Sequence, residues 1–292
     1  MNRERMTVVI ATRDRAGELG RTLSRLAELP EQPAVIVVDN ASRDGTAGLV
    51  RRGYPGVRLI RLPCNRGAVA RNIGAAAADT RFVAFCDDDS WWEPGALACA
   101  ARALESCPAL AVVAGQTLVG PGAEPDPVNA AMERSPLGQD GLPGPRVLGF
   151  LACAAVVRRS AFLEVGGFSD VLVFGGEEKL LAMDLAAAGW AAAYVSGARA
   201  RHWPSARRDE AARRRLDARN EVLTAWLRRP AGHALAATAG LISRLGRDPA
   251  AAGALASLLR VLPRALRQRR VLPAAAEADV RALARWDREF RP

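Results

Sequence analysis

Residues 82–89 read Phe-Val-Ala-Phe-Cys-Asp-Asp-Asp, an apolar run that ends directly in three carboxylates. An uninterrupted apolar run of this length indicates a strand that is covered on both faces, as in a parallel sheet. Three adjacent aspartates repel one another unless water or a cation screens them, and Mg²⁺ or Mn²⁺ binds carboxylates together with substrate phosphate oxygens. Aspartate is also common in turns and at helix caps. The triplet alone leaves both interpretations open.

Three similar units precede this stretch. Strand-like segments at 7–11, 34–38 and 57–62 each lead into a segment with a helical pattern. This alternation predicts an α/β fold with a doubly wound, mainly parallel sheet. Ligands of such sheets bind beyond the carboxyl ends of the strands, so the residues that follow the strands are candidate site residues. They are Thr12, Arg13, Asp14, Asp39, Asn40, Asn65, Arg66, Gly67, Asp87, Asp88 and Asp89.

The rest of the chain predicts fewer strands and more helices. Residues 111–119 and 192–195 have strand patterns, whereas residues 120–145 are rich in proline and glycine and predict a long loop. Residues 177–188 have a helical pattern. Beyond Pro204 the pattern is helical, with breaks predicted at four prolines: Pro230, Pro249, Pro263 and Pro273.

Composition excludes several classes of protein. The longest uncharged apolar runs, such as 148–157, are far shorter than the roughly 20 residues that cross a bilayer, so we expect no transmembrane helix. Residues 1–5 are charged and unlike a secretory signal, which predicts a cytoplasmic protein. The five cysteines include no C-x-x-C pair, which argues against a disulfide framework and a thiolate zinc site. The absence of G-x-x-x-x-G-K-[ST] excludes a P-loop kinase.

Positive charge is concentrated in the C-terminal third. Residues 201–292 hold 20 basic and 9 acidic side chains, whereas residues 1–200 hold 21 and 22. Leucines and arginines alternate here at helical spacing, which suits helices that lie on an anionic membrane. The same pattern suits helices that pack on the preceding domain and expose their arginines to water. No aromatic and basic RNA-binding motif is present, and we expect no nucleic-acid partner.

Four motifs, taken in order, resemble one family. They are Val-Val-Ile-Ala-Thr-Arg-Asp-Arg (8–15), Val-Val-Asp-Asn-Ala-Ser-Arg-Asp-Gly-Thr (37–46), Asn-Arg-Gly-Ala-Val-Ala-Arg-Asn-Ile-Gly (65–74) and Phe-Cys-Asp-Asp-Asp (85–89). The set closely resembles glycosyltransferase family 2, whose members have the GT-A fold. Gly-Gly-Phe (166–168) and Gly-Gly-Glu-Glu (175–178) fit the same pattern, so the resemblance covers about residues 6–230.

The resemblance implies an inverting glycosyltransferase, with a GT-A catalytic domain at 1–230 and a basic helical C-terminal extension at 231–292. Residues 1–119 would form the nucleotide-sugar-binding half and 146–230 the acceptor-side half. The donor would be a UDP, dTDP or GDP sugar held with Mg²⁺ or Mn²⁺. The acceptor would be a sugar, a lipid-linked molecule or a small molecule, as in bacterial polysaccharide, cell-envelope or natural-product glycoside synthesis. A peripheral contact with the inner face of the membrane would involve the basic tail.

The resemblance also implies roles on the donor side. Thr12 and Arg13 would lie near the base or ribose, with Asp39 against the base. Asn65 and Gly67 would belong to a donor-contacting segment, in which Arg71 pairs with phosphate or base. An Asx turn at Asp39 and a surface salt bridge at Arg71 are the structural alternatives.

Within the aspartate triplet, Asp89 would bind the metal directly, Asp87 would contact ribose or metal, and Asp88 would support them. His202, between a strand and Trp203-Pro204, would approach the metal or diphosphate, although a lone histidine is more often structural. Arg207 and Arg208 would close over the diphosphate, and a solvated helix start is the structural alternative.

The acidic pair at 177–178 would supply the base that deprotonates the acceptor hydroxyl. Family members usually have aspartate second in this pair, so Glu178 is one methylene longer. It is the first candidate, and Glu177 is the reserve. Both residues would also stabilise the start of any helix, which is the structural alternative.

Two rival functions remain at this stage. A sugar nucleotidyltransferase would have a glycine-rich loop directly after the first strand, whereas this chain has no glycine there before Gly17. A non-catalytic protein that binds nucleotide sugars is supported only by the basic tail.

Overall fold

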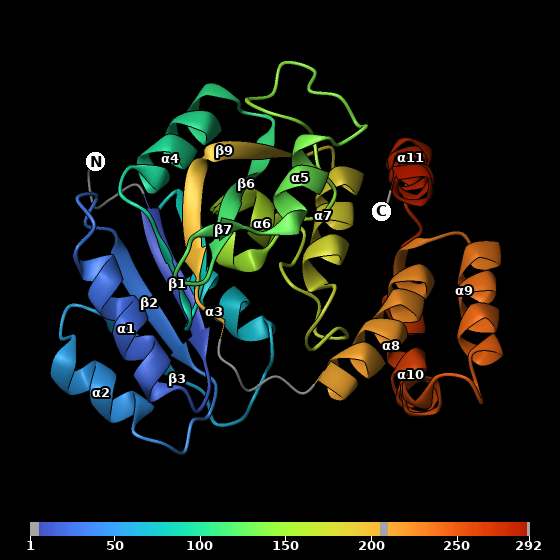
Figure 1. The fold of residues 1–292 in the computed structure, drawn as a ribbon, viewed down its shortest axis with the longest axis horizontal. Coiled ribbons are helices and arrows are strands. Elements are labelled where there is room, and N and C mark those ends of the chain that lie inside the picture. The colour runs from blue at the N-terminus through green and yellow to red at the C-terminus, as the bar shows by residue number, and fades with distance from the viewer. Residues whose placement is uncertain (1–5, 205–209, 291–292) are drawn as a thin grey trace.

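The computed structural model describes residues 6–204 and 210–290, which form a central sheet with helices on both faces and a group of C-terminal helices beside it (Figure 1). In the described residues the sheet has nine strands in the order β3-β2-β1-β4-β8-β6-β9-β5, with β7 paired to β6. The predicted α/β fold is therefore confirmed. Arg207 and Arg208 lie outside the described residues.

The first four strands are parallel, as predicted. They are β1 (Met6–Thr12), β2 (Ala34–Asp39), β3 (Arg58–Arg61) and β4 (Phe82–Asp87). The register sets Thr12 opposite Asp39 and Ala11 opposite Asp87. Three polar strand ends consequently meet at one edge of the sheet.

The second half of the sheet has mixed strand directions. Strand β8 (Ala155–Arg158) is antiparallel to both β4 and β6 (Leu110–Val119), whereas β6 and β9 (Ala191–His202) are parallel. The short strand β5 (Ser90–Trp92), which was not predicted, pairs antiparallel with the end of β9. Strand β9 is longer than the predicted 192–195. It continues past Gly197 with a register shift against Gly115 and Gln116, because its pairing with β6 outweighs its weak strand propensity.

The sheet is buried on both faces, which explains the apolar strands. Val8 and Ile10 of β1 pack on one face, and Val9 between them packs on the other. The first face is covered by α1 (Ala16–Ala27), α2 (Thr46–Gly53) and α4 (Ala96–Ser106). The second face is covered by α3 (Val69–Ala77), α6 (Arg159–Glu164) and α7 (Glu177–Ala187). A short 3₁₀ segment, η1 (Ala152–Ala154), leads into β8.

The predicted long loop at 120–145 is wrong in part, because it contains β7 (Glu124–Pro125) and α5 (Pro127–Glu133). Asp126 caps α5, and its carboxylate accepts a hydrogen bond from the Val128 N–H. Buried Asn129 accepts from the Thr117 N–H (3.0 Å) and donates to the Thr117 carbonyl (2.8 Å). These two bonds attach α5 to the end of β6.

The C-terminal helices are α8 (Glu210–Arg228), α9 (Ala231–Ser243), α10 (Pro249–Arg267) and α11 (Ala274–Phe290). Breaks occur at Pro230, Pro249 and Pro273, but the predicted break at Pro263 is wrong because this residue lies inside α10. Side chains buried on both sides of it, including Leu258 and Ala265, hold the helix together despite the missing N–H.

The C-terminal helices bury two different sets of side chains. Leu241 and Leu258 belong to a cluster that also contains Val171, Leu172 and Leu180. Helix α11 instead returns to the sheet side of the molecule, where its apolar residues join the core cluster of α3 and α7 (Figure 1). Within the part of the chain described, no helix combines the length and apolarity needed to cross a membrane.

Candidate functional site

Asp88 faces the protein interior. Its Oδ2 accepts a hydrogen bond from the Thr12 hydroxyl (2.9 Å), and its backbone carbonyl accepts one from the Thr22 hydroxyl (2.8 Å). Arg15 Nη1 lies 3.6 Å from Oδ1. Burial raises the pKa of Asp88 to about 7, although Arg15 and Thr12 favour the charged form. Asp88 and Thr12 thus hold the triplet against α1.

Asp89 lies beside His202, 113 residues later in the chain. The pairing of β5 with β9 sets Ser90 opposite His202, which brings the imidazole Nε2 to 3.5 Å from Asp89 Oδ1. Arg15 Nη1 donates to Asp89 Oδ2 (3.2 Å). Carboxylate oxygens suit Mg²⁺ and Mn²⁺, and a neutral imidazole is a common metal ligand. In the described residues no group of three or more His, Cys, Asp or Glu can hold a metal ion, so a cation here needs further oxygens from a substrate.

Asp87 pairs with Arg71, whose guanidinium donates to Asp87 Oδ1. The Arg71 side chain is buried, and its guanidinium carbon lies 5.7 Å from the centre of the Phe168 ring. The Asp87 side chain remains 31% exposed. The charge of Arg71 also interacts with Glu177 and Glu178, so this arginine links the aspartate triplet to the acidic pair.

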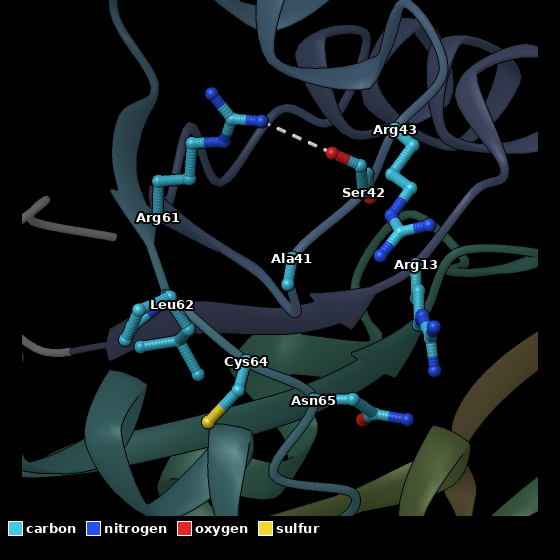
Figure 2. A pocket seen from close by; sticks show the side chains of 9 residues that line it. Arg13, Ala41, Ser42, Arg43, Arg61, Leu62, Cys64 and Asn65 are labelled. Atoms are coloured by element: carbon cyan, nitrogen blue, oxygen red, sulfur yellow. Dashed lines mark hydrogen bonds between the residues drawn. The ribbon is translucent and has the colours of Figure 1, made fainter.

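A pocket of about 640 Å³ opens beyond the ends of β2 and β3 (Figure 2). It is lined by Arg13, Ala41, Ser42, Arg43, Arg61, Leu62, Pro63, Cys64 and Asn65. Three arginines make its rim cationic. Thr12, in contrast, turns away from this pocket toward Asp88.

Asp39 is fully buried beside this pocket. Its Oδ1 accepts a hydrogen bond from the Ser42 N–H three residues later (2.8 Å), which stabilises the loop after β2. Its Oδ2 lies 3.4 Å from Arg61 Nε and has no hydrogen-bond donor among the described residues. A buried carboxylate oxygen without a donor is costly, and a ligand N–H or O–H would satisfy it.

Gly67 lets two loops approach each other closely. Its φ is 57°, and a Cβ at this position would lie 2.4 Å from the Val173 carbonyl oxygen. The Ala68 N–H donates to that same carbonyl (3.1 Å). Asn65 stabilises the turn by accepting from the Gly67 N–H (2.9 Å). The segment of Asn65 and Gly67 therefore supports the loop that leads to the acidic pair.

The acidic pair begins α7 after two glycines with left-handed backbones, Gly175 (φ 87°) and Gly176 (φ 79°). Glu177 is 2% exposed, and its Oε2 has no hydrogen-bond donor among the described residues. Glu178 is half-buried and lines a second cavity, between α5, α7 and α11. Burial and the Glu177 charge raise the pKa of Glu178 to about 8, and burial also raises that of Glu177. Glu178 is among the residues that line this cavity, and Glu177 is not.

Two asparagines of the site were given no role by the sequence analysis. Asn40 bridges two loops, since it donates to the Gly67 carbonyl (3.1 Å) and accepts from the Arg66 N–H (2.7 Å). Asn72 holds the Gly-Gly-Phe turn through the Phe168 carbonyl (2.8 Å) and N–H (2.9 Å). Both residues, like Arg15, lie within the quoted motifs, which was the available signal.

Asn220 of α8 had no such signal. Its amide donates to the Phe174 carbonyl (2.7 Å) and the Gly175 carbonyl (2.5 Å). A residue outside every motif thus fixes the turn before the acidic pair.

Comparisons with known proteins identify the family to which this chain is similar. The family model described as glycosyl transferase family 2 matches residues 7–166. N-acetylglucosaminyl-diphospho-decaprenol L-rhamnosyltransferase of Mycobacterium tuberculosis is 29% identical over 235 residues, which are 68% of this chain and 75% of that protein. Pre-mycofactocin glycosyltransferase of M. tuberculosis is 31% identical over 188 residues, which are 60% of this chain and 38% of that protein.

Solved structures share the fold. Mannosyltransferase PcManGT from Pyrobaculum calidifontis, in complex with GDP-Man and Mn²⁺, is similar with a TM-score of 0.63 at 21% identity. The match covers 100% of this chain and 89% of that one. S. aureus TarS is similar with a TM-score of 0.58 at 19% identity, over 98% of this chain and 53% of that one.

Proposed function

The chain belongs to glycosyltransferase family 2, and we propose that it transfers a sugar, with inversion, from a nucleoside-diphosphate sugar to an acceptor hydroxyl. The observation that carries this proposal is the position of Arg71, whose charge interacts with Asp87 on one side and with Glu177 and Glu178 on the other. Candidate groups for the leaving diphosphate and for the attacking hydroxyl therefore flank one buried cation.

On the donor side, the nucleoside occupies the pocket beyond β2 and β3. Asp39 Oδ2, which has no donor in the described chain, accepts a hydrogen bond from the base. Arg13 lies at the rim, where it contacts base or ribose. The donor is a UDP, dTDP or GDP sugar.

The diphosphate lies between this pocket and the acidic pair. Asp89 and His202 would hold a Mg²⁺ or Mn²⁺ ion together with phosphate oxygens of the donor, and Asp87 would be a further ligand or a ribose contact. When bound, the ion would neutralise the charge that builds on the leaving diphosphate. Arg71 adds a second positive charge beside Asp87.

On the acceptor side, Glu178 acts as the general base. The acceptor O–H gives its proton to Glu178, its oxygen bonds to the anomeric carbon, and the bond from that carbon to the diphosphate oxygen breaks. The nucleoside diphosphate leaves with the electron pair. Attack from the face opposite the leaving group inverts the anomeric carbon. Glu177, buried beside Glu178, helps to hold the raised pKa that keeps Glu178 basic.

We also propose that the protein is cytoplasmic and contacts the inner face of the membrane through the basic helices. Leu259 and Leu266 are exposed on α10, one residue before Arg260 and Arg267. This combination of apolar and cationic side chains suits an anionic lipid surface. The acceptor would belong to polysaccharide, cell-envelope or natural-product glycoside synthesis.

Nucleotide binding tests the donor side. Mn²⁺ together with UDP, dTDP or GDP should raise the melting temperature of the protein, because a ligand that binds only the folded state stabilises it. Release of nucleoside diphosphate from a panel of nucleotide sugars then identifies the donor. No thermal shift with any of the three nucleotides would count against the proposal.

Substitution of the acidic pair tests the acceptor side. Glu178→Gln should abolish transfer while leaving the nucleotide-induced thermal shift intact. Glu28→Gln makes the same change at an exposed position that lines neither cavity, so it is the matched control and should retain transfer. Full turnover by Glu178→Gln would move the base elsewhere, with Glu177 as the first alternative.

A further inference from the structure

Helix α11 is held in place by two ion pairs that link it to different parts of the molecule. Arg229, the residue directly after α8, donates to both carboxylate oxygens of buried Glu277 (2.6 and 3.0 Å). Arg146, in the loop before β8, lies 2.9 Å from each carboxylate oxygen of Asp279. Paired contacts of this kind fix orientation as well as distance. The first half of α11 is therefore positioned by specific contacts.

The second half of α11 forms one wall of the cavity that Glu178 lines. This cavity has a volume of about 440 Å³ and lies between α5, α7 and α11 (the helices are seen in Figure 1). Most of its lining side chains are apolar and include Met132, Leu148, Phe150, Met183, Leu283 and Trp286. Glu178 and Lys179 are among its few charged residues.

We propose that this cavity is the acceptor site, and that the acceptor carries an apolar group next to the hydroxyl that receives the sugar. The inference rests on the proposed function, because it takes Glu178 as the base. A hydroxyl that reaches Glu178 from the side of α11 must bring its neighbouring atoms into the cavity. Sites with apolar walls and a few polar groups are typical of ligands with an apolar body.

The apolar walls argue against a purely polar acceptor. The hydroxyl groups of a free sugar would lose water on entering and would find few partners among Leu148, Phe150 and Leu283. An alkyl or aromatic group would instead gain from burial, about fourfold in affinity for each CH₂ group removed from water. Trp286 adds a flat apolar surface at the α11 side.

Simple glycosides test the preference. Methyl, n-octyl and phenyl glycosides of a panel of sugars, all below their micellar concentrations, are compared as acceptors by release of nucleoside diphosphate. We expect kcat/KM for the octyl or phenyl compound to exceed that for the methyl compound by about tenfold or more, as burial of a few CH₂ groups requires. The ratio of kcat/KM for the octyl compound to kcat/KM for the phenyl compound then separates alkyl from aromatic acceptors.

A cavity-filling variant assigns the preference to α11. Ala284 is exposed and lines the cavity, so that Ala284→Phe fills it without disturbing the core. Ala278→Phe makes the same change at an exposed position of α11 that is not in the cavity lining, and it is the matched control. The preference for the octyl or phenyl glycoside should disappear in Ala284→Phe and persist in Ala278→Phe.

Calorimetric titration with octyl glycosides, without donor, gives a readout besides activity. We expect the unmodified protein and Ala278→Phe to bind the octyl glycosides and Ala284→Phe not to bind them. This result would support the site even if no sugar of the panel is accepted. Equal kcat/KM for methyl and octyl glycosides, or equal octyl binding by both phenylalanine variants, would overturn it. Failure of Mn²⁺ and nucleotide to bind is a different result, which contradicts the proposed function.

Discussion

The raised pKa of the proposed base Glu178 predicts that activity depends on pH. A carboxylate accepts a proton only when it is ionised, so transfer should fall as pH drops through the pKa of the base. Burial and the Glu177 charge raise that pKa to about 8, far above the ordinary glutamate value of about 4.3. We therefore expect kcat/KM to rise with pH and to level off only above this range. A pH profile with nucleotide-sugar donor measures this, and a plateau that extends down to the ordinary glutamate range would contradict the assignment.

Asp88 and Asp89 are neighbours with different surroundings, and their amide variants should differ. Asp89→Asn removes a charge that lies beside His202, and we expect Mn²⁺-dependent nucleotide binding to weaken strongly. Asp88→Asn replaces a buried carboxylate whose pKa is already raised to about 7, so binding should change little. Titration of Mn²⁺ at fixed UDP, dTDP or GDP, followed by thermal shift, compares the two. An equal loss of Mn²⁺-dependent nucleotide binding in both variants would contradict the different roles given to Asp88 and Asp89.

Single residues were predictable where they lie in a motif at a strand end. Asp39 and Asp87 follow apolar runs, and parallel strands bring such ends together. Asn220 was not predictable, because its contacts with Phe174 and Gly175 join α8 to a loop about 45 residues earlier. Only the folded chain brings these segments together.

At the scale of elements, strands were predictable when their own side chains required burial. Strands β1, β2 and β4 are rich in valine, isoleucine or phenylalanine, and the structure buries them on both faces. Strand β9 contains five alanines and a glycine, which have little strand propensity, and it is held by its pairing with β6. Strand β5 exists because it pairs with the far end of β9. His202 reaches Asp89 only through these two strands.

Helix α10 contains an interior proline, Pro263, that we expect to destabilise it. Pro263 lies on the exposed side of the helix. Because proline has no backbone N–H, one hydrogen bond of the helix is missing there. Pro263→Ala should raise the free energy of unfolding by about 1 to 3 kcal/mol. Pro249→Ala is the control, because a proline in the first turn of a helix costs little. Urea unfolding of both variants decides this, and a gain in neither would show that α10 unfolds independently of the measured transition.

At the scale of the whole molecule, the C-terminal helices bury some of their leucines against the preceding domain and expose others. Leu241 and Leu258 are buried, whereas Leu245 and Leu259 are exposed. The sequence could not distinguish these leucines, because all four lie at helical spacing among arginines. Tertiary packing on Val171, Leu172 and Leu180 selects the buried ones. The exposed ones remain available for a partner.

Lipid vesicles test whether that partner is a membrane. Leu259 and Leu266 are seven residues apart and lie on the same side of α10, with Arg260 and Arg267 beside them. We expect the protein to sediment with vesicles of phosphatidylglycerol and phosphatidylcholine but not with phosphatidylcholine alone, and salt should weaken the binding by screening.

The double variant Leu259→Ser with Leu266→Ser should bind the anionic vesicles about tenfold more weakly or worse, because two apolar side chains no longer leave water. Leu163→Ser, at a leucine of α6 that is 37% exposed, removes the same kind of side chain elsewhere and should bind normally. Salt-sensitive binding that the double variant retains would mean that arginines alone contact the lipid. Equal binding to both vesicle types would exclude a charge-selective membrane surface on α10.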